Sequence, residues 1–279
     1  MRVARTQAQA KVNLFLRVGP RDASGYHEIT TLFHRIDLAD DVVVRVGGSV
    51  RALDCAGPQL PPAGLGDPDK NLAYRAAAAF AERAGWPRGF AIELTKNIPV
   101  GGGLGGGSAD AGAVLRALEA MAPRPIGAEA LQGVAASLGS DVPFFASEHV
   151  SAKGSGRGET LEPALATPYP ALLLVPRFSI STADAYRWLD EFREAGTSPP
   201  SDPTGNDFEP VVEARYPELC EYRTRLVASG ARIARLSGSG STVFGVFEGS
   251  APSGKDMAVD GLVLTTRTSS RVVQVEVLE

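Results

Sequence analysis

The residues whose types most suggest chemistry form a glycine-rich segment, with six glycines between Gly101 and Gly107. Residues 90–96 alternate like a half-buried strand, and residues 111–121 place apolar side chains at helical spacing. Glycines let backbone N–H groups turn inward, and a helix N-terminus adds free donors and partial positive charge. The segment therefore predicts a loop that binds a phosphate chain, with Ser108 placed to cap the helix or touch the ligand.

The spacing of the glycines excludes one class of phosphate loop and leaves another open. Gly107 stands where the ATPase P-loop requires lysine, which excludes that loop. A dinucleotide-binding pattern does match at Gly101, Gly103 and Gly106, and it leaves an NAD(P)-dependent oxidoreductase as an alternative. That match is weak, because any glycine run satisfies it. A flexible linker is the other alternative, and the periodic strand and helix on either side argue against it.

The composition is that of a globular protein, with 44% apolar and 22% charged residues over 279 positions. A net charge of −4 without a basic block makes nucleic acid an unexpected partner. No apolar run is long enough for a transmembrane helix, and Lys11 and Asn13 interrupt any secretory signal. Two cysteines without a C-x-x-C motif favour a reduced, cytoplasmic chain, and the three histidines lack metal-site spacing.

The elements that must position the loop alternate between strands and helices, which predicts an α+β protein of two domains. In the first half we expect strands over 12–18, 29–38 and 42–46 after a short N-terminal one, an irregular excursion over 52–69, and helices over 68–83 and 128–138. A second glycine-rich loop covers 153–159. In the second half we expect strands over 171–175, 243–247, 262–266 and 272–277, a helix over 182–194, a loop over 197–206, and a third glycine turn at 237–241.

Five motifs are spread along nearly the whole chain in a fixed order. They are residues 10–16 (AKVNLFL), 25–28 (GYHE), 99–109 (PVGGGLGGGSA), 138–145 (LGSDVPFF) and 237–240 (SGSG). Together they resemble the motifs of the GHMP small-molecule kinases, and residues 71–76 and 206–209 fit one branch of that family. Two departures, Ser241 where many relatives carry proline and the variant loop at 152–157, leave the catalytic positions unchanged.

The resemblance implies a fold and a reaction. The fold is a two-domain α+β GHMP kinase fold, with an ATP-binding domain over residues 1–162 that resembles domain 2 of ribosomal protein S5 and a ferredoxin-like domain over residues 163–279. The reaction is transfer of a phosphoryl group from ATP, with Mg²⁺, to a hydroxyl of a small acceptor. The Mg²⁺ ligands stay open; Ser108 is a candidate, and Asp110 could contact the ion through water.

The nucleotide would lie on the glycine loop and near the start of the preceding helix. The resemblance assigns ATP binding to Asn71 on the adenine side and to Pro99, Val100, Gly101, Gly102, Gly103, Leu104, Gly105, Gly106, Gly107, Ser108 and Ala109. Lys96 could reach the nucleotide or be solvated.

Two residues match the family's catalytic pair. Lys11 corresponds to the active-site lysine, and it shares one strand face with Asn13, so the two could line a site together. Taken alone, such a lysine is more often a solvated residue on an edge strand. Asp141 corresponds to the catalytic aspartate, and the following Pro143 makes a helix N-cap an equally good interpretation. A cap position would also fix the carboxylate, so both interpretations can hold.

The acceptor in the branch that the chain resembles carries a cytidine diphosphate group. Tyr26 and His27 match the family's base-binding pair, and Tyr186 matches its second aromatic residue. A base stacked between two rings with histidine at its polar edge is sound recognition chemistry. Tyr186 could instead belong to a helix core, in which case Phe178 is the competing stacker. Asn13 completes the predicted substrate-binding set.

A sister kinase of the family, acting on homoserine, mevalonate or a sugar, is the nearest alternative function. Tyr26 and His27 argue against it, because those acceptors offer no base to stack. The expected partner is a small molecule with a CDP moiety, and no obligate protein partner, membrane or nucleic acid is inferred.

Overall fold

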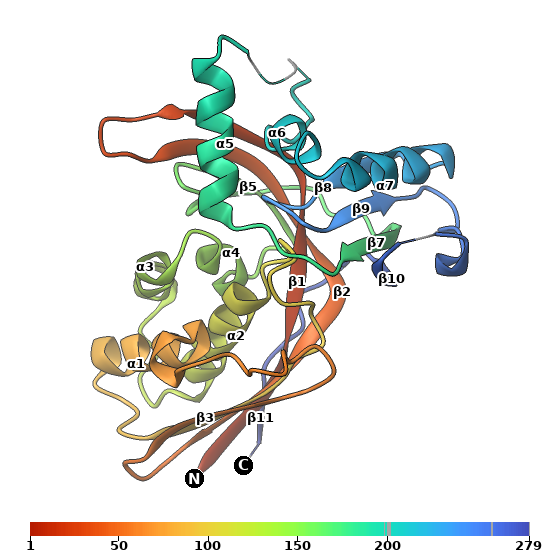
Figure 1. The fold of residues 1–279 in the computed structure, drawn as a ribbon. Coiled ribbons are helices and arrows are strands. Elements are labelled where there is room, and N and C mark those ends of the chain that lie inside the picture. Colours follow the sequence, from red (N-terminus) through yellow and green to blue (C-terminus); the bar gives the residue numbers. More distant parts are fainter. Residues whose placement is uncertain (198, 200–201, 258, 279) are drawn as a thin grey trace.

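The computed structural model describes residues 1–197, 199, 202–257 and 259–278, and these form two sheets with helices packed against them (Figure 1). The first sheet is built on two long antiparallel strands, β1 (Arg2–Arg21) and β2 (His27–Val46). Its order is β11-β1-β2-β4-β3, and β5 and β6 continue from β2. These shorter strands are β3 (Arg51–Ala56), β4 (Phe90–Thr95), β5 (Ser151–Ser155), β6 (Thr160–Pro163) and β11 (Glu276–Leu278).

A β-bulge in the middle of β1 decides where its side chains point. The pairing with β2 shifts register between Gln9 and Lys11. Before the shift, Ala8 packs against the helices that cover this sheet. From Ala10 onward, Ala10 and Val12 pack instead against residues of the second sheet, which is described below. Because both faces of this stretch are covered, its polar side chains are buried and need partners.

Helices α1 (Leu72–Ala84), α2 (Gly106–Met121), α3 (Ala128–Leu138) and α4 (Val142–Ala146) lie together beside the long strands (Figure 1). The central one is α2, which packs on β1 and contacts α1, α3 and α4, so it is buried over most of its surface. Its alanines and Gly112 allow this close packing, because a Cβ at Gly112 would lie 2.5 Å from the backbone of Phe145.

The second sheet has the order β10-β7-β9-β8 and carries helices of its own. Its strands are β7 (Pro170–Pro176), β8 (Ile233–Leu236), β9 (Val243–Val246) and β10 (Gly261–Arg267), and the helices are α5 (Thr182–Glu194), α6 (Glu209–Glu213) and α7 (Pro217–Ala228). In Figure 1, α5 lies beside the hairpin that joins β1 to β2. Arg193 of α5 ties the two together through the carbonyls of Val18 and Gly19.

The predicted α+β class is confirmed, and α3 and α5 have the predicted bounds. Several details of the prediction are wrong. The early strands are continuous long strands, and residues 51–56 form β3, which pairs in parallel with β4. The helix expected over 68–83 is a short 3₁₀ turn, Pro68–Lys70, followed by α1, because Asn71 has extended backbone and caps the second helix. Of the expected loop at 197–206, positions 198, 200 and 201 lie outside the described residues.

The last strand is shorter than predicted and returns to the first sheet. Residues 276–278 form β11, which pairs with β1 at the N-terminus of the chain, and the two termini lie close together in Figure 1. The domain division at 162/163 stays a prediction. Among the described residues, no helix is both long and apolar enough to cross a membrane.

Candidate active site

The glycine-rich loop joins β4 to α2, as the sequence predicts. Gly101, Gly103 and Gly105 adopt φ angles of 78°, 78° and 73°, a left-handed conformation that side chains disfavour. The helix begins at Gly106 with Gly105 as its N-cap and no side-chain cap bond. The predicted cap by Ser108 is therefore wrong, since this half-buried residue lies inside the first turn. The first N–H groups of α2 are left available for an anion.

The loop also packs tightly against the third glycine turn, which belongs to the second half of the chain. A Cβ at Gly103 would lie 2.2 Å from the carbonyl oxygen of Ser237 and 2.7 Å from that of Gly240. The Gly103 carbonyl accepts a hydrogen bond from Ser237 Oγ at 2.9 Å, and Thr242 N–H donates to the Gly102 carbonyl at 3.1 Å. Glycine at position 103 is thus needed for packing between the two halves, beyond any role in phosphate binding.

Lys11 lies beside this loop, buried in the middle of β1. It is 3% exposed, and its backbone N–H donates to the Leu104 carbonyl at 3.0 Å, so the alternative of a solvated residue on an edge strand is wrong. Its ammonium donates to Asn13 Oδ1 at 2.5 Å and to the Gly103 carbonyl at 3.0 Å. Burial lowers the pKa of Lys11, and the Asp141 carboxylate opposes that shift.

Asp141 is the acidic partner of Lys11, with 3.7 Å between Nζ and Oδ2. It stands at the N-cap position of α4, yet its side chain makes no capping hydrogen bond. Asp141 therefore occupies the N-cap position, as one interpretation predicted, but its carboxylate does not cap the helix. With 31% of its side chain exposed, Asp141 can meet a hydroxyl that enters from solvent.

A hydrogen-bond chain fixes the lysine. Asn13 Nδ2 donates to Thr31 Oγ1 at 2.8 Å, and Thr31 in turn donates to the Phe15 carbonyl at 2.7 Å. All the donors of this chain are buried, so each must find an acceptor, and the Lys11 ammonium is held in one place. The sequence indicated Asn13 but not Thr31. Thr31 lies on β2, and the bulges in β1 decide which β1 residues it faces.

A buried charge cluster that the sequence did not reveal ties down both ends of the glycine loop. Lys96 contacts the carboxylates of Asp40 and Asp110, and Asp40 accepts the N–H groups of Asn97 and Ile98. Lys96 is 2% exposed, so it is not solvated. Burial raises the pKa of Asp110 although Lys96 opposes it, and Asp110 Oδ1 has no hydrogen-bond partner.

The predicted base-binding residues meet in a groove of about 1410 Å³ between the β1–β2 hairpin and α5. The rings of His27 and Tyr186 stack with centroids 5.0 Å apart, and Tyr26 is 52% exposed. Burial raises the pKa of Tyr186 to about 12, with the Asp141 charge as a second cause, and Ser140, the neighbour of Asp141 in the chain, also lines the groove. Phe178 stacks on Tyr216 instead and does not line the groove.

Two further groove residues were missed by the sequence reasoning. His27 Nδ1 faces the Gly19 carbonyl at 3.0 Å, and its Nε2 lies 3.3 Å from Asp190. Asp190 follows Tyr186 by one helical turn on α5, a spacing that could have indicated it. The Arg157 guanidinium lies 3.6 Å from the centroid of the Tyr26 ring, a contact that no local spacing predicts.

The remaining predicted residue, Asn71, caps α1 by accepting the N–H of Ala73 at 2.9 Å. The next residue, Leu72, lies near Gly107, since a Cβ there would be 3.8 Å from the Leu72 side chain. The start of α1 therefore adjoins the glycine loop, and a contact of Asn71 with ATP stays a prediction. No group of three or more potential metal ligands from His, Cys, Asp and Glu occurs in the part of the chain that the structure describes.

Comparison with known families decides the class of the protein. Residues 71–149 match the model for the GHMP kinases N terminal domain, and residues 184–258 match the model for the GHMP kinases C terminal. The chain belongs to the GHMP kinase family. The resemblance found in the sequence is confirmed, the chain is a small-molecule kinase, and the oxidoreductase and linker alternatives are wrong.

Curated relatives and solved structures narrow the family further. A 4-diphosphocytidyl-2-C-methyl-D-erythritol kinase of Anaeromyxobacter sp. (strain K) is 44% identical over 270 residues, which cover 92% of this chain and 85% of the relative. One from Nitratidesulfovibrio vulgaris (strain DP4) is 42% identical, covering 85% of this chain and 87% of the relative. A crystal structure of 4-(cytidine 5'-diphospho)-2C-methyl-D-erythritol kinase superposes with a TM-score of 0.77 at 36% identity, covering 95% of this chain and 100% of that one. A homoserine kinase from Cytophaga hutchinsonii, at 17% identity and a TM-score of 0.67, shares the fold.

Proposed function

We propose that the protein transfers the γ-phosphoryl group of ATP to a hydroxyl of 4-diphosphocytidyl-2-C-methyl-D-erythritol, giving the 2-phosphate in the non-mevalonate pathway to isoprenoid precursors. One observation carries the proposal beyond the relatives' names. Lys11 of the Lys11–Asp141 pair bonds to the glycine loop at the Gly103 carbonyl, and the groove that contains Tyr26, His27 and Tyr186 is also lined by Ser140, which precedes Asp141 in the chain. A nucleotide and a base-bearing acceptor would therefore meet at this pair.

The proposed chemistry uses residues that are already held in place. The acceptor oxygen attacks the γ-phosphorus, the bond from that phosphorus to the β–γ bridging oxygen breaks, and ADP leaves. The hydroxyl proton passes to Asp141, whose main task in a loose transition state is to position the hydroxyl. Lys11, fixed by Asn13 and Gly103, offsets the negative charge on the transferring group. The start of α2 binds the phosphate chain through backbone N–H groups.

The residues present fit a Mg²⁺ ion bound largely through ATP. Mg²⁺ at such sites is held by one or two protein oxygens together with phosphate oxygens and water. Ser108 lies in the first turn of α2, and the unpartnered Oδ1 of Asp110 lies two residues further on. When bound, the ion would neutralise phosphate charge as the β–γ bond breaks.

The groove gives the CDP-linked acceptor an advantage over the acceptors of sister kinases. A base can stack on Tyr186 or Tyr26 while His27 and Asp190 meet its polar edge. Homoserine and mevalonate have no group that would use these rings. A cytoplasmic location remains part of the proposal, since it rests on composition: Cys55 and Cys220 are both free.

The proposal is tested by measuring ADP release and the phosphorylated product by ³¹P NMR with three acceptors. We expect turnover with ATP, Mg²⁺ and the CDP-linked acceptor, and kcat/KM lower by orders of magnitude with mevalonate or homoserine. Preference for either small acceptor would assign the protein to a sister activity. The absence of turnover with all three would refute the reaction itself.

A further inference from the structure

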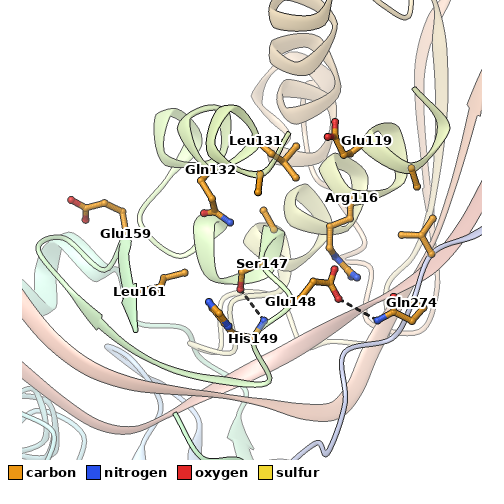
Figure 2. A pocket seen from close by; sticks show the side chains of 14 residues that line it. Arg116, Glu119, Leu131, Gln132, Ser147, Glu148, His149, Glu159, Leu161 and Gln274 are labelled. Atoms are coloured by element: carbon orange, nitrogen blue, oxygen red, sulfur yellow. Dashed lines mark hydrogen bonds between the residues drawn. The ribbon is translucent and has the colours of Figure 1, made fainter. Parts of the chain in front are cut away.

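A second cavity lies away from the proposed active site and has no part in the mechanism (Figure 2). It encloses about 730 Å³ between α2, the N-terminal half of α3, the segment after α4, β6 and the segment before β11. The acceptor groove touches α3 only at its C-terminal half, from Ala136 to Leu138. Among the described residues, Glu159 alone lines both spaces.

The most unusual side chain of this cavity is Arg116. It is 5% exposed, and only its Nη1 has a partner, the Val273 carbonyl at 2.9 Å. Its Nε and Nη2 are buried without a hydrogen-bond partner. These two nitrogens form the edge of a guanidinium that grips a carboxylate or phosphate through two parallel bonds. Because unpaired donors on a buried cation are unfavourable, this edge of the guanidinium favours binding of an anionic group.

A second buried cation makes the need for negative charge stronger. Arg35 is 1% exposed, and it donates to the carbonyls of Phe144, Phe145 and Ser147 without a carboxylate partner. Burial, and then repulsion by Arg116, lower the pKa of Arg35 to about 9. Within the described residues, neither guanidinium has a carboxylate within 4.0 Å. Arg35 does not itself line the cavity, and its charge lies close enough to that of Arg116 for the two to repel.

Three glutamates, Glu119, Glu148 and Glu159, also line the cavity, and Glu148 is the one whose negative charge acts on Arg116 and Arg35. This exposed residue bonds to Gln274 at 3.2 Å, and Figure 2 shows both beside the Arg116 side chain. Glu148 would thus compete with an incoming anion and must turn aside to admit it. Leu131 and Leu161 provide the larger apolar side chains of a lining that is otherwise mixed.

We propose that this cavity is a binding site for a small organic anion. Its carboxylate or phosphate head binds the Nε–Nη2 edge of Arg116, and a short aliphatic body packs against Leu131 and Leu161. The Arg116 edge favours an anionic head group over a neutral one, and the two leucines favour a ligand that also has an aliphatic body.

The test uses the full chain and two probes, sodium hexanoate and hexyl phosphate, with hexanol as the neutral control. Binding is measured by calorimetry and by the ¹H–¹⁵N signal of the Arg116 Nε–H group. We expect saturable binding of at least one anion, a shift of that signal, and weaker binding by hexanol. The anion that binds more tightly identifies whether the head group is a carboxylate or a phosphate.

Variants locate the site. Gln132→Trp fills the cavity from a half-buried wall position and should abolish binding, whereas Glu129→Trp, on the exposed surface of the same helix, should not. Arg116→Lys keeps the charge but loses the two-pronged edge, and should weaken binding by ~10-fold or more. Glu148→Gln removes the competitor and should tighten binding.

Four results would overturn the proposal. They are no saturable binding of either anion, undiminished binding by Gln132→Trp, hexanol binding as tightly as hexanoate, and displacement of the probe by CDP, which would place it in the acceptor groove. Because Gln132→Trp leaves the buried arginines intact, the test stands even if Arg116→Lys folds poorly. None of these outcomes depends on kinase activity.

Discussion

The two ends of the candidate active site differ in how firmly their side chains are held in place. At the proposed phosphoryl-transfer end (the phosphoryl end: Lys11, Asp141 and the glycine loop), Lys11 is 3% exposed and its ammonium is fixed by Asn13 and Gly103. At the proposed base-binding end, Tyr26 is 52% exposed, and the Arg157 guanidinium lies over its ring. Groups that act on the transition state must be positioned before the substrate arrives, whereas a stacking clamp can close around it. The phosphoryl end should therefore control kcat, and the base end should control acceptor affinity.

The largest expected effect is at the phosphoryl end. Asp141→Asn should leave the fold intact, since the side chain makes no cap bond, and should lower kcat by about 10²–10⁴-fold, the range for a lost general base. Circular dichroism and steady-state kinetics measure the two quantities. Asp190→Asn is the matched control at the base end, and its effect should appear in acceptor KM. A variant Asp141→Asn that keeps more than about a tenth of the wild-type kcat would remove the residue from catalysis.

The base end should respond in affinity. Losing one stacking ring costs about 1–3 kcal/mol, or roughly 5- to 150-fold. Tyr26→Ala and Tyr186→Ala should weaken acceptor binding by this factor and leave ATP binding near normal, as measured by calorimetry. His27→Ala should blur the discrimination of cytosine from uracil, because a polar base edge loses its partner. If Tyr186→Ala alone leaves acceptor binding unchanged, the second stacking ring is a different residue.

The glycine loop offers a test of what its glycines do. Gly103→Val places a side chain against the Ser237 and Gly240 carbonyls at a left-handed φ, and should destabilise the protein by about 2 kcal/mol or more. Gly107→Ala, whose Cβ meets only Leu72 at 3.8 Å, is the control and should be near neutral. Denaturant unfolding gives both values, and KM for ATP should rise in Gly103→Val. Equal stability of the two variants would contradict the packing role.

The smallest expected effect is a change in the pKa of Lys11. Asp141 favours the charged form of Lys11, so its negative charge opposes the lowering by burial. Asp141→Asn removes that charge, and the pKa of Lys11 should fall further, so that the ammonium loses its proton at lower pH than in the wild type. NMR of ¹³C-labelled lysine follows this directly. An unchanged or raised pKa of Lys11 would mean that the two groups are not coupled.

Much of the arrangement of the candidate site could be predicted, because the sequence patterns that indicate it are local. The strand–glycine–helix order around Gly101–Gly107 and the shared face of Lys11 and Asn13 depend on neighbours in the chain. Family resemblance supplied Asp141 and the aromatic residues. What these signals cannot give is the side to which Lys11 points, because the bulge after Gln9 changes the alternation.

The parts that could not be predicted join distant segments. Asp40 meets Lys96 across two strands, and Arg157 reaches Tyr26 from another hairpin. The packing of Gly103 on Ser237 depends on how the two sheets meet. The composition of residues 52–69 predicted an irregular segment, and this was wrong for its first part. Residues 51–56 form a strand because they pair in parallel with β4, an interaction that local propensity cannot indicate.

The central claim is that the base and the nucleotide phosphates occupy separate ends of one site that meet at Lys11 and Asp141. The most direct measurement is the inhibition pattern of free CDP with each substrate varied in turn. We predict that CDP inhibits competitively when the acceptor is varied and non-competitively or not at all when ATP is varied. The inhibition constant of CDP should rise in Tyr186→Ala. Competition with ATP alone, or no inhibition at millimolar CDP, would contradict the account.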